Sequence, residues 1–195
     1  IMSSQLTRIN PGAKLIGRAR TVRCFDDILT IIEALADAES GDVLVIDTQG
    51  TQRAVVGELF SVEATRRGMA GIVIDGGCRD VETIRKLPTP VYATHVTPVA
   101  GTAQKCGEIG STIICAGVEV NDRDIVFGDE DGVIVMSESE LGVLQPHAAQ
   151  IKATEQRILA EMEQGRNLMS MINLEQHLEA VKNGSYDSRL QFTLE

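Results

Sequence analysis

Two uninterrupted runs of apolar, mostly β-branched residues constrain the fold most strongly. They are "VLVID" (43–47) and "AGIVID" (70–75), and neither shows the polar alternation of a strand with one face in water. Such runs are typical of strands buried on both faces, as in a parallel sheet. Between them, "GELFSVEATRRG" (57–68) has the pattern of a helix that ends at a glycine. The order predicts a β-α-β unit.

The segments on either side extend this unit in the same style. A strand at 14–24 and a helix at 26–38 are expected before it. After it, we expect a short helix at 80–87, which Pro88 ends, and a strand at 90–93. The first half of the chain is therefore predicted to be βαβαβ.

The pattern changes in the second half. Short apolar runs separated by turns occupy 107–136, and Asp131-Gly132 between two of them is a hairpin signal. A long helical pattern follows at 138–164. We therefore predict an α/β fold with an antiparallel β second half and a C-terminal helix. It is expected to form one domain over 1–165, followed by a helical tail over 166–195.

Composition narrows the class of protein. The chain is 43% hydrophobic and 24% charged, has a formal net charge of −10, and contains only 3% aromatic residues. An acidic chain repels phosphate backbones and has few rings for base stacking, so nucleic acid is not expected as a partner. No apolar run approaches the roughly 18 residues of a membrane helix. The four cysteines lack metal-ligand spacing, and we expect a cytoplasmic protein with reduced thiols.

Arg79 and Asp80 follow the predicted strand 70–75 directly. Gly76 and Gly77 precede them and are expected to let the backbone turn tightly. Ligands of open α/β sheets bind beyond the carboxyl ends of strands, where an arginine suits a carboxylate and an aspartate suits a hard divalent cation. The same two residues are also typical of a helix N-cap beside a surface arginine.

A second candidate element opens the predicted helix 57–68. The first N–H groups of a helix have no internal acceptor, so those of Leu59 and Phe60 are expected to suit an anion. Glu58 beside them is either part of a site or only a first-turn acid that complements the helix dipole. Because this helix and Arg79 follow successive strands, we expect the two elements to face one another.

The long C-terminal helix has a carboxylate in its apolar stripe. Glu155 fills the gap in a pattern of apolar residues spaced three and four apart: Leu141, Leu144, Ala148, Ile151, Ile158 and Met162. Burying a carboxylate is costly unless it is paired or binds something. Glu155 therefore reaches solvent at the edge of the stripe, pairs with an arginine, or belongs to a site.

Glu58, twenty intervening residues and Arg79-Asp80 form a signature. It resembles that of the class II pyruvate aldolases of the 4-hydroxy-4-methyl-2-oxoglutarate type, which share a superfamily with the RraA regulators of RNase E. The resemblance covers about residues 12–165 and includes "GDVLVID" (41–47), "GIVIDGGCRD" (71–80), "PVYA" (90–93) and "GDEDGVIVM" (128–136).

The resemblance implies roles for the matching residues. Asp80 would bind Mg²⁺ or Mn²⁺, and Arg79 would bind the pyruvyl part of a small 2-oxo acid. The turn of Gly57, Leu59 and Phe60 would hold the substrate carboxylate through backbone N–H groups.

The resemblance also implies an assembly. The family fold is a swivelling β/β/α domain that forms trimers or hexamers with sites at subunit interfaces. Glu58 would position Arg79 or a water molecule, and Glu155 would approach the metal's water shell from the adjacent subunit. The family carries a few dozen residues before the strand at 14–24, so the start of this chain is expected to be missing.

The resemblance implies a metal-dependent lyase. It would cleave 4-hydroxy-4-methyl-2-oxoglutarate-type acids to pyruvate by retro-aldol chemistry and would also decarboxylate oxaloacetate. A water held by Glu58 and Glu155 is the expected base. The alternative is a non-catalytic regulator of the RNase E type, since a net charge of −10 suits a basic partner segment.

Overall fold

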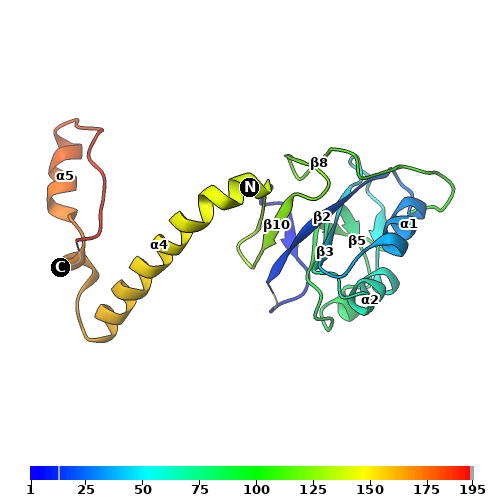
Figure 1. Cartoon of the computed structure of the whole chain (residues 1–195), viewed down its shortest axis with the longest axis horizontal. Coiled ribbons are helices and arrows are strands. Elements are labelled where there is room, and N and C mark those ends of the chain that lie inside the picture. Colours follow the sequence, from blue (N-terminus) through cyan, green and yellow to red (C-terminus); the bar gives the residue numbers. More distant parts are fainter. Residues whose placement is uncertain (13, 194–195) are drawn as a thin grey trace. The chain divides into compact units, whose positions relative to one another are not determined.

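A computed structural model describes residues 1–12 and 14–193. The chain divides into two compact units, Ile1–Leu141 and Gly142–Glu195, and the described residues of each are treated separately. The sheet of the first unit contains β1 (Thr7–Arg8), β2 (Leu15–Arg23), β3 (Asp42–Asp47), β4 (Ala54–Val56), β5 (Gly71–Cys78), β6 (Val91–Val96), β7 (Glu108–Ile109), β10 (Ile125–Gly128) and β11 (Val133–Met136). Its main strand order is β1-β6-β5-β3-β2-β10-β11, with β4 beside β5 and β7 beside β2. Figure 1 shows the neighbouring strands β10, β2, β3 and β5 of this sheet.

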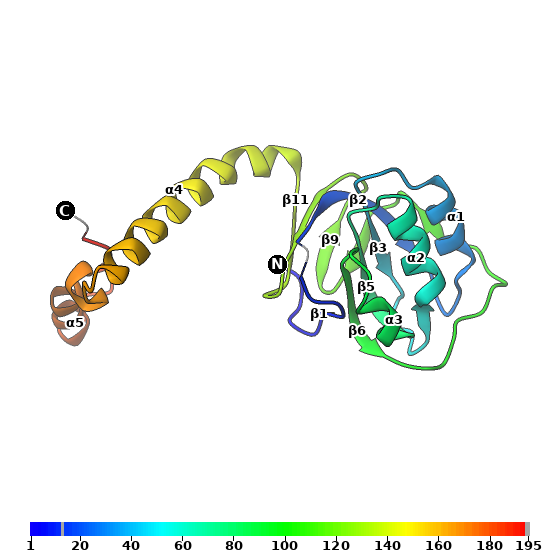
Figure 2. The ribbon, with the colours of Figure 1, turned by 90° about the horizontal axis from the view of Figure 1, so that it is seen from below.

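The centre of this sheet is parallel, as the two apolar runs predict. Strands β2, β3, β5 and β6 pair in parallel. Helices α1 (Leu29–Asp37), α2 (Glu58–Arg66) and α3 (Val81–Ile84) connect them and cover one face of the sheet (Figure 2). The predicted βαβαβ first half is therefore confirmed.

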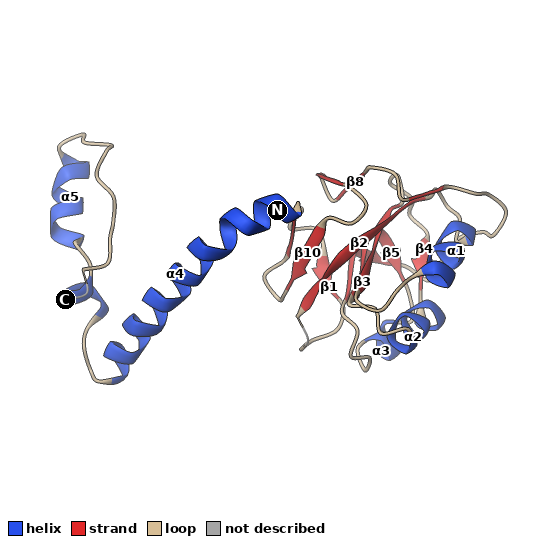
Figure 3. Ribbon diagram, in the orientation of Figure 1, coloured by secondary structure: helices blue, strands red, loops and turns tan. Residues whose placement is uncertain are grey.

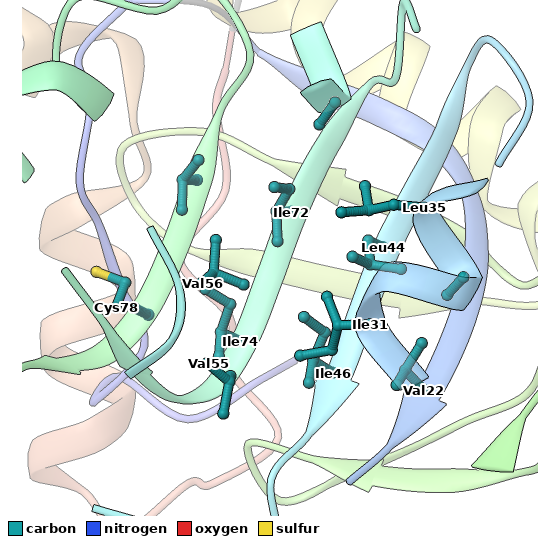
Figure 4. Close-up of a cluster of buried hydrophobic side chains, with 14 of the residues drawn as sticks. Val22, Ile31, Leu35, Leu44, Ile46, Val55, Val56, Ile72, Ile74 and Cys78 are labelled. Atoms are coloured by element: carbon teal, nitrogen blue, oxygen red, sulfur yellow. The ribbon is translucent and has the colours of Figure 1, made fainter. Parts of the chain in front are cut away.

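Both faces of the central strands are buried, which explains why their sequences do not alternate. Leu44 and Ile46 point to the helices and join a core cluster there (Figure 4). Val43 and Val45 point the other way, into a second cluster. That second face is covered by the antiparallel pair β8 (Ile113–Cys115) and β9 (Val118–Val120).

The antiparallel second half is also present. Strands β10 and β11 form a hairpin, with Gly128 opposite Val133, and β10 pairs antiparallel with β2 (Figure 3). The turn contains Asp131-Gly132, and Gly132 has a φ of 148°, a conformation that glycine adopts without strain.

Two expectations near the end of β5 are corrected. Gly76 and Gly77 do not form a turn, because β5 continues through them to Cys78. They are needed for close packing instead: a Cβ on Gly77 would lie 2.8 Å from the carbonyl oxygen of Arg53. The helix expected at 80–87 is a single turn, α3.

The second unit contains most of α4 (Glu138–Glu163), the 3₁₀ turn η1 (Leu168–Met171) and α5 (Leu174–Lys182). Ile158 is buried on α4, whereas Leu144 and Ile151 are 49% and 60% exposed. Glu155 is exposed and forms no ion pair with a described residue. Among the described residues, no helix is long and apolar enough to cross a membrane.

Candidate functional site

The ends of two neighbouring strands build the site. Strand β4 pairs with β5 in parallel, with Val56 opposite Cys78. Helix α2 begins directly after β4, and Arg79 directly follows β5. The Arg79 N–H donates to the carbonyl of Val56 at 3.0 Å, which fixes the two strand ends together. The structure thus brings together the two elements that the sequence suggested.

Asp80 reaches from its turn to the start of α2. Its Oδ2 accepts a hydrogen bond from the Glu58 N–H at 3.1 Å and lies 3.4 Å from Nε of Arg79. Asp80 occupies the N-cap position of α3, as one alternative predicted, but its side chain makes no capping bond to that helix. Asp80 has φ 58° and ψ 35°, a left-handed conformation that aspartate tolerates better than most residues. The turn therefore aims the carboxylate at the neighbouring helix.

Gly57 allows this close approach. A Cβ at this position would lie 2.6 Å from Oδ2 of Asp80 and 3.0 Å from Cγ of Arg79. No side chain fits there without moving the Arg-Asp pair. Gly57 was singled out from the sequence as part of a substrate-binding turn, and its structural role is to leave room for Arg79 and Asp80.

The first turn of α2 offers free donors. The N–H groups of Leu59 and Phe60 donate to no acceptor among the described residues. They lie at the positive end of the helix dipole, where an anion is stabilised. The Ser61 N–H and hydroxyl both donate to the carbonyl of Gly57, at 3.1 and 2.9 Å, and close the turn.

The charges of the site are unevenly paired. Arg79 forms its ion pair with Asp80, and the side chains are 46% and 40% exposed. The exposed Glu58 carboxylate contacts no cation among the described residues and therefore forms no ion pair with Arg79 here. Burial raises the pKa of the Cys78 thiol to about 11, and the charge of Asp80 adds to the rise. The Cys78 thiol is therefore held in its protonated form near neutral pH.

A small hollow of about 110 Å³ lies at this junction. The Gly57–Phe60 turn and the Arg79-Asp80 pair line it, together with Ile28, Ala100 and Gly101. Those last three residues come from distant segments and were not expected from the sequence. Larger hollows, of about 600 and 510 Å³, lie along the N-terminal segment and the β10–β11 hairpin, and neither contains the Arg-Asp pair.

Asp80 fits a divalent cation of the Mg²⁺ type. Its Oδ1 accepts no hydrogen bond from a described residue, and its side chain is accessible. No cluster of three or more His, Cys, Asp or Glu suited to a metal occurs in residues 1–12 and 14–193, which argues against a cage made only of protein ligands. Mg²⁺ is usually held by one or two carboxylates, with water and substrate oxygens completing its shell. The residues present match that donor set.

Comparison with known proteins places the chain among the RraA-like proteins. A family model described as "RraA-like: Aldolase/RraA" matches residues 1–135. An uncharacterized protein of Methanocaldococcus jannaschii is 35% identical over 164 residues, which cover 83% of this chain and 79% of that protein. The 4-hydroxy-4-methyl-2-oxoglutarate aldolase of Thermus thermophilus is 33% identical, over 67% of this chain and 80% of its own length.

Solved structures with the same fold carry other names. The RNA-processing inhibitor RraA of Thermus thermophilus is 30% identical with a TM-score of 0.67, covering 70% of this chain and 84% of that one. A structure from Geobacillus kaustophilus has the same identity and TM-score and covers 70% and 86%; it is described as an S-adenosylmethionine:2-dimethylmenaquinone methyltransferase. The α/β fold with its C-terminal helix is confirmed, but function must be argued from the site.

Proposed function

Since the chain belongs to the RraA-like family, we propose that it is a metal-dependent lyase of the 4-hydroxy-4-methyl-2-oxoglutarate aldolase type. It would cleave such 2-oxo acids to pyruvate and would also decarboxylate oxaloacetate. One observation carries the proposal. The Asp80 carboxylate is fixed beside Arg79 and the start of α2, yet one of its oxygens accepts no hydrogen bond from residues 1–12 or 14–193.

The residues divide the substrate between them. The Leu59 and Phe60 N–H groups would bind the C1 carboxylate at the start of α2. The planar guanidinium of Arg79 would donate to the oxygens of the pyruvyl part. Asp80 would hold Mg²⁺ or Mn²⁺, which when bound supplies Lewis-acid stabilisation of the charge that develops on the 2-oxo oxygen.

Aldol cleavage requires a proton acceptor. The 4-hydroxyl gives up its proton, the C3–C4 bond breaks, and its electron pair moves into the pyruvyl part to form an enolate, which is then protonated at C3. Glu58 is exposed at the site and has no cationic partner among the described residues, so it is suited to hold the accepting water. Glu155 is predicted to contribute to the same water from an adjacent subunit of a trimer or hexamer.

Decarboxylation of oxaloacetate uses the same residues with one fewer requirement. Loss of CO₂ leaves the same enolate, and no hydroxyl proton has to be removed. Arg79 would stabilise the developing charge in both reactions. The two reactions should therefore share Arg79 and Asp80 and differ in their need for Glu58.

A protein-binding regulator is the second candidate. The match to the RNA-processing inhibitor RraA and the net charge of −10 favour it, because an acidic surface attracts a basic partner segment. Such binding needs no metal at Asp80. Dependence on a divalent cation therefore separates the two candidates.

The test is pyruvate release from oxaloacetate and from 4-hydroxy-4-methyl-2-oxoglutarate. It should require Mg²⁺, stop with EDTA and be lost in Asp80→Ala. Asp37→Ala, which removes an exposed carboxylate at the end of α1, is the matched control and should keep full activity. A well-folded wild-type protein that releases no pyruvate from either acid would favour the regulator.

A further inference from the structure

One wall of the site belongs to a segment without regular structure. Residues 97–107 connect β6 to β7 and place Ala100 and Gly101 in the hollow beside Arg79 and Asp80. We propose that Asp27 is the positioning residue of this wall: it fixes the segment so that the hollow holds the body of the substrate. This inference rests on the proposed function for the identity of the ligand.

The inner edge of the segment is tied to β4. The Ala54 N–H donates to the carbonyl of Val99 at 2.7 Å, and the Gly101 N–H donates back to the carbonyl of Ala54 at 2.9 Å. Nη1 of Arg53 donates to the carbonyl of Ala100, also at 2.9 Å. These bonds fix residues 99–101 along β4, but they do not hold residues 102–107 at the far side of the segment.

The far side is tied to residues 26–30, with the largest number of bonds going to one buried carboxylate. The Thr102 N–H donates to the carbonyl of Asp26 at 2.6 Å, and the Gly107 N–H donates to Oγ1 of Thr30 at 2.6 Å. Oδ2 of Asp27 accepts hydrogen bonds from the Gln104 N–H at 2.6 Å, the Thr102 hydroxyl at 2.7 Å and the Lys105 N–H at 3.1 Å. Its Oδ1 accepts from the Leu29 N–H at 2.9 Å, at the start of α1. Asp27 is 2% exposed, so it has no access to a metal or a substrate and acts only through what it holds.

The anchor and the wall are directly connected. Ile28, next to Asp27, lines the same hollow, and its N–H donates to the carbonyl of Thr102 at 2.8 Å. A Cβ on Gly101 would lie only 3.1 Å from Cγ2 of Ile28, so the two walls are already in close contact. Release of Thr102, Gln104 and Lys105 would therefore shift the wall that faces the Arg-Asp pair.

The decisive variant is Asp27→Asn. The amide keeps the size of the side chain, and its oxygen can still accept the Leu29 N–H. Its NH₂ group then takes the place of Oδ2, where it cannot accept the hydrogen bonds that Oδ2 receives. The matched control is Asp42→Asn, because Asp42 is 4% exposed and also accepts from a backbone N–H and from Arg123. Asp42 begins β3, at the end of the strand opposite the site.

The two variants are compared by hydrogen exchange of residues 97–107 and by the kinetics of oxaloacetate decarboxylation with Mg²⁺. Asp27→Asn should speed exchange in 97–107 and raise KM about tenfold, because a displaced wall weakens binding. It should leave kcat within about threefold, since Arg79 and Asp80 keep their places. Asp42→Asn should change neither exchange in 97–107 nor KM, although both variants should lower the melting temperature.

Faster exchange with an unchanged KM would overturn the proposal, as would an equal rise of KM in Asp42→Asn. A wild-type protein that decarboxylates nothing would overturn the proposed function instead. In that case the positioning role is judged on exchange of 54–60 and Arg79 in Asp27→Asn. Faster exchange there, absent in Asp42→Asn, would support the role, and unchanged exchange would refute it.

Discussion

Asp80 and Asp27 are the same residue type at the same end of one sheet, yet their surroundings differ completely. Asp80 is 40% exposed and accepts one backbone hydrogen bond, with Arg79 as its partner. Asp27 is 2% exposed, and four donors from the protein occupy its two oxygens. A carboxylate that the fold leaves partly unsatisfied is available to a ligand, whereas a saturated one holds the chain in place. The predictions test this contrast.

The largest effect is expected for Arg79→Ala, which removes the cation beside the exposed Asp80. Loss of a donor to developing negative charge costs about 10³-fold in kcat for both reactions. The exposed Arg85 lies at the end of α3 and forms no ion pair with a described residue, so Arg85→Ala is the control and should keep full activity. Comparable losses in the two variants would show that general charge, and not the Arg-Asp turn, carries the reaction.

Gly57→Ala tests whether Asp80 is held as tightly in its exposed surroundings as Asp27 is in its buried ones. The added methyl group would displace Oδ2 of Asp80, which lies 2.6 Å from its position. Displacing the Asp80 carboxylate by about 1 Å should lower kcat/KM about 10²-fold in both reactions. Gly142→Ala adds the same methyl group to α4, with no atom within 4 Å, and should leave kinetics unchanged. A fully active Gly57→Ala would mean that Asp80 need not approach α2.

Glu58→Gln should separate the two reactions. Loss of the carboxylate that holds the accepting water should lower the rate of aldol cleavage about 10²-fold. Oxaloacetate decarboxylation needs no such base and should fall much less. The measurement is kcat for both substrates on the same preparation, with exposed Glu82→Gln as the control. Equal losses in the two reactions would contradict the assignment of the base to Glu58.

The same contrast explains what could be predicted from the sequence. The surroundings of Asp80 were predictable because they consist of two short stretches of sequence. Arg79 and Asp80 are adjacent, and Gly57, Leu59 and Phe60 lie within one helical turn. The central strands were predictable because burial on both faces leaves uninterrupted apolar runs.

The bonds by which Asp27 holds residues 97–107 were not predictable in this way. The bonds from Asp27 to Thr102, Gln104 and Lys105 span 75 to 78 residues and leave no periodic pattern in the sequence. Strand β4 is only three residues long, and no strand was predicted from the sequence at this position. The predicted role of Glu155 depends on a second subunit, and neither the stripe pattern nor this single chain determines it.

The smallest expected effect is the pH dependence of the buried anchor. Burial alone would raise the pKa of Asp27, but hydrogen bonds from Gln104, Leu29, Thr102 and Lys105 outweigh it and lower the pKa from 3.8 to about 2. A pKa lowered in the folded state adds stability above the unfolded value, and this stability is lost as the pH falls toward the folded value.

The unfolding free energies of the wild type and Asp27→Asn, measured in urea, should therefore differ by a constant amount from about pH 8 to pH 5. Below about pH 4 the difference should narrow, because protonation removes the charge that the variant already lacks. Asp47 and Asp27 both raise the pKa of the buried Cys24 thiol, so Asp47→Asn is measured in parallel. A difference that changes between pH 8 and pH 5 would show that Asp27 titrates near neutrality and is not the saturated anchor that its four donors imply.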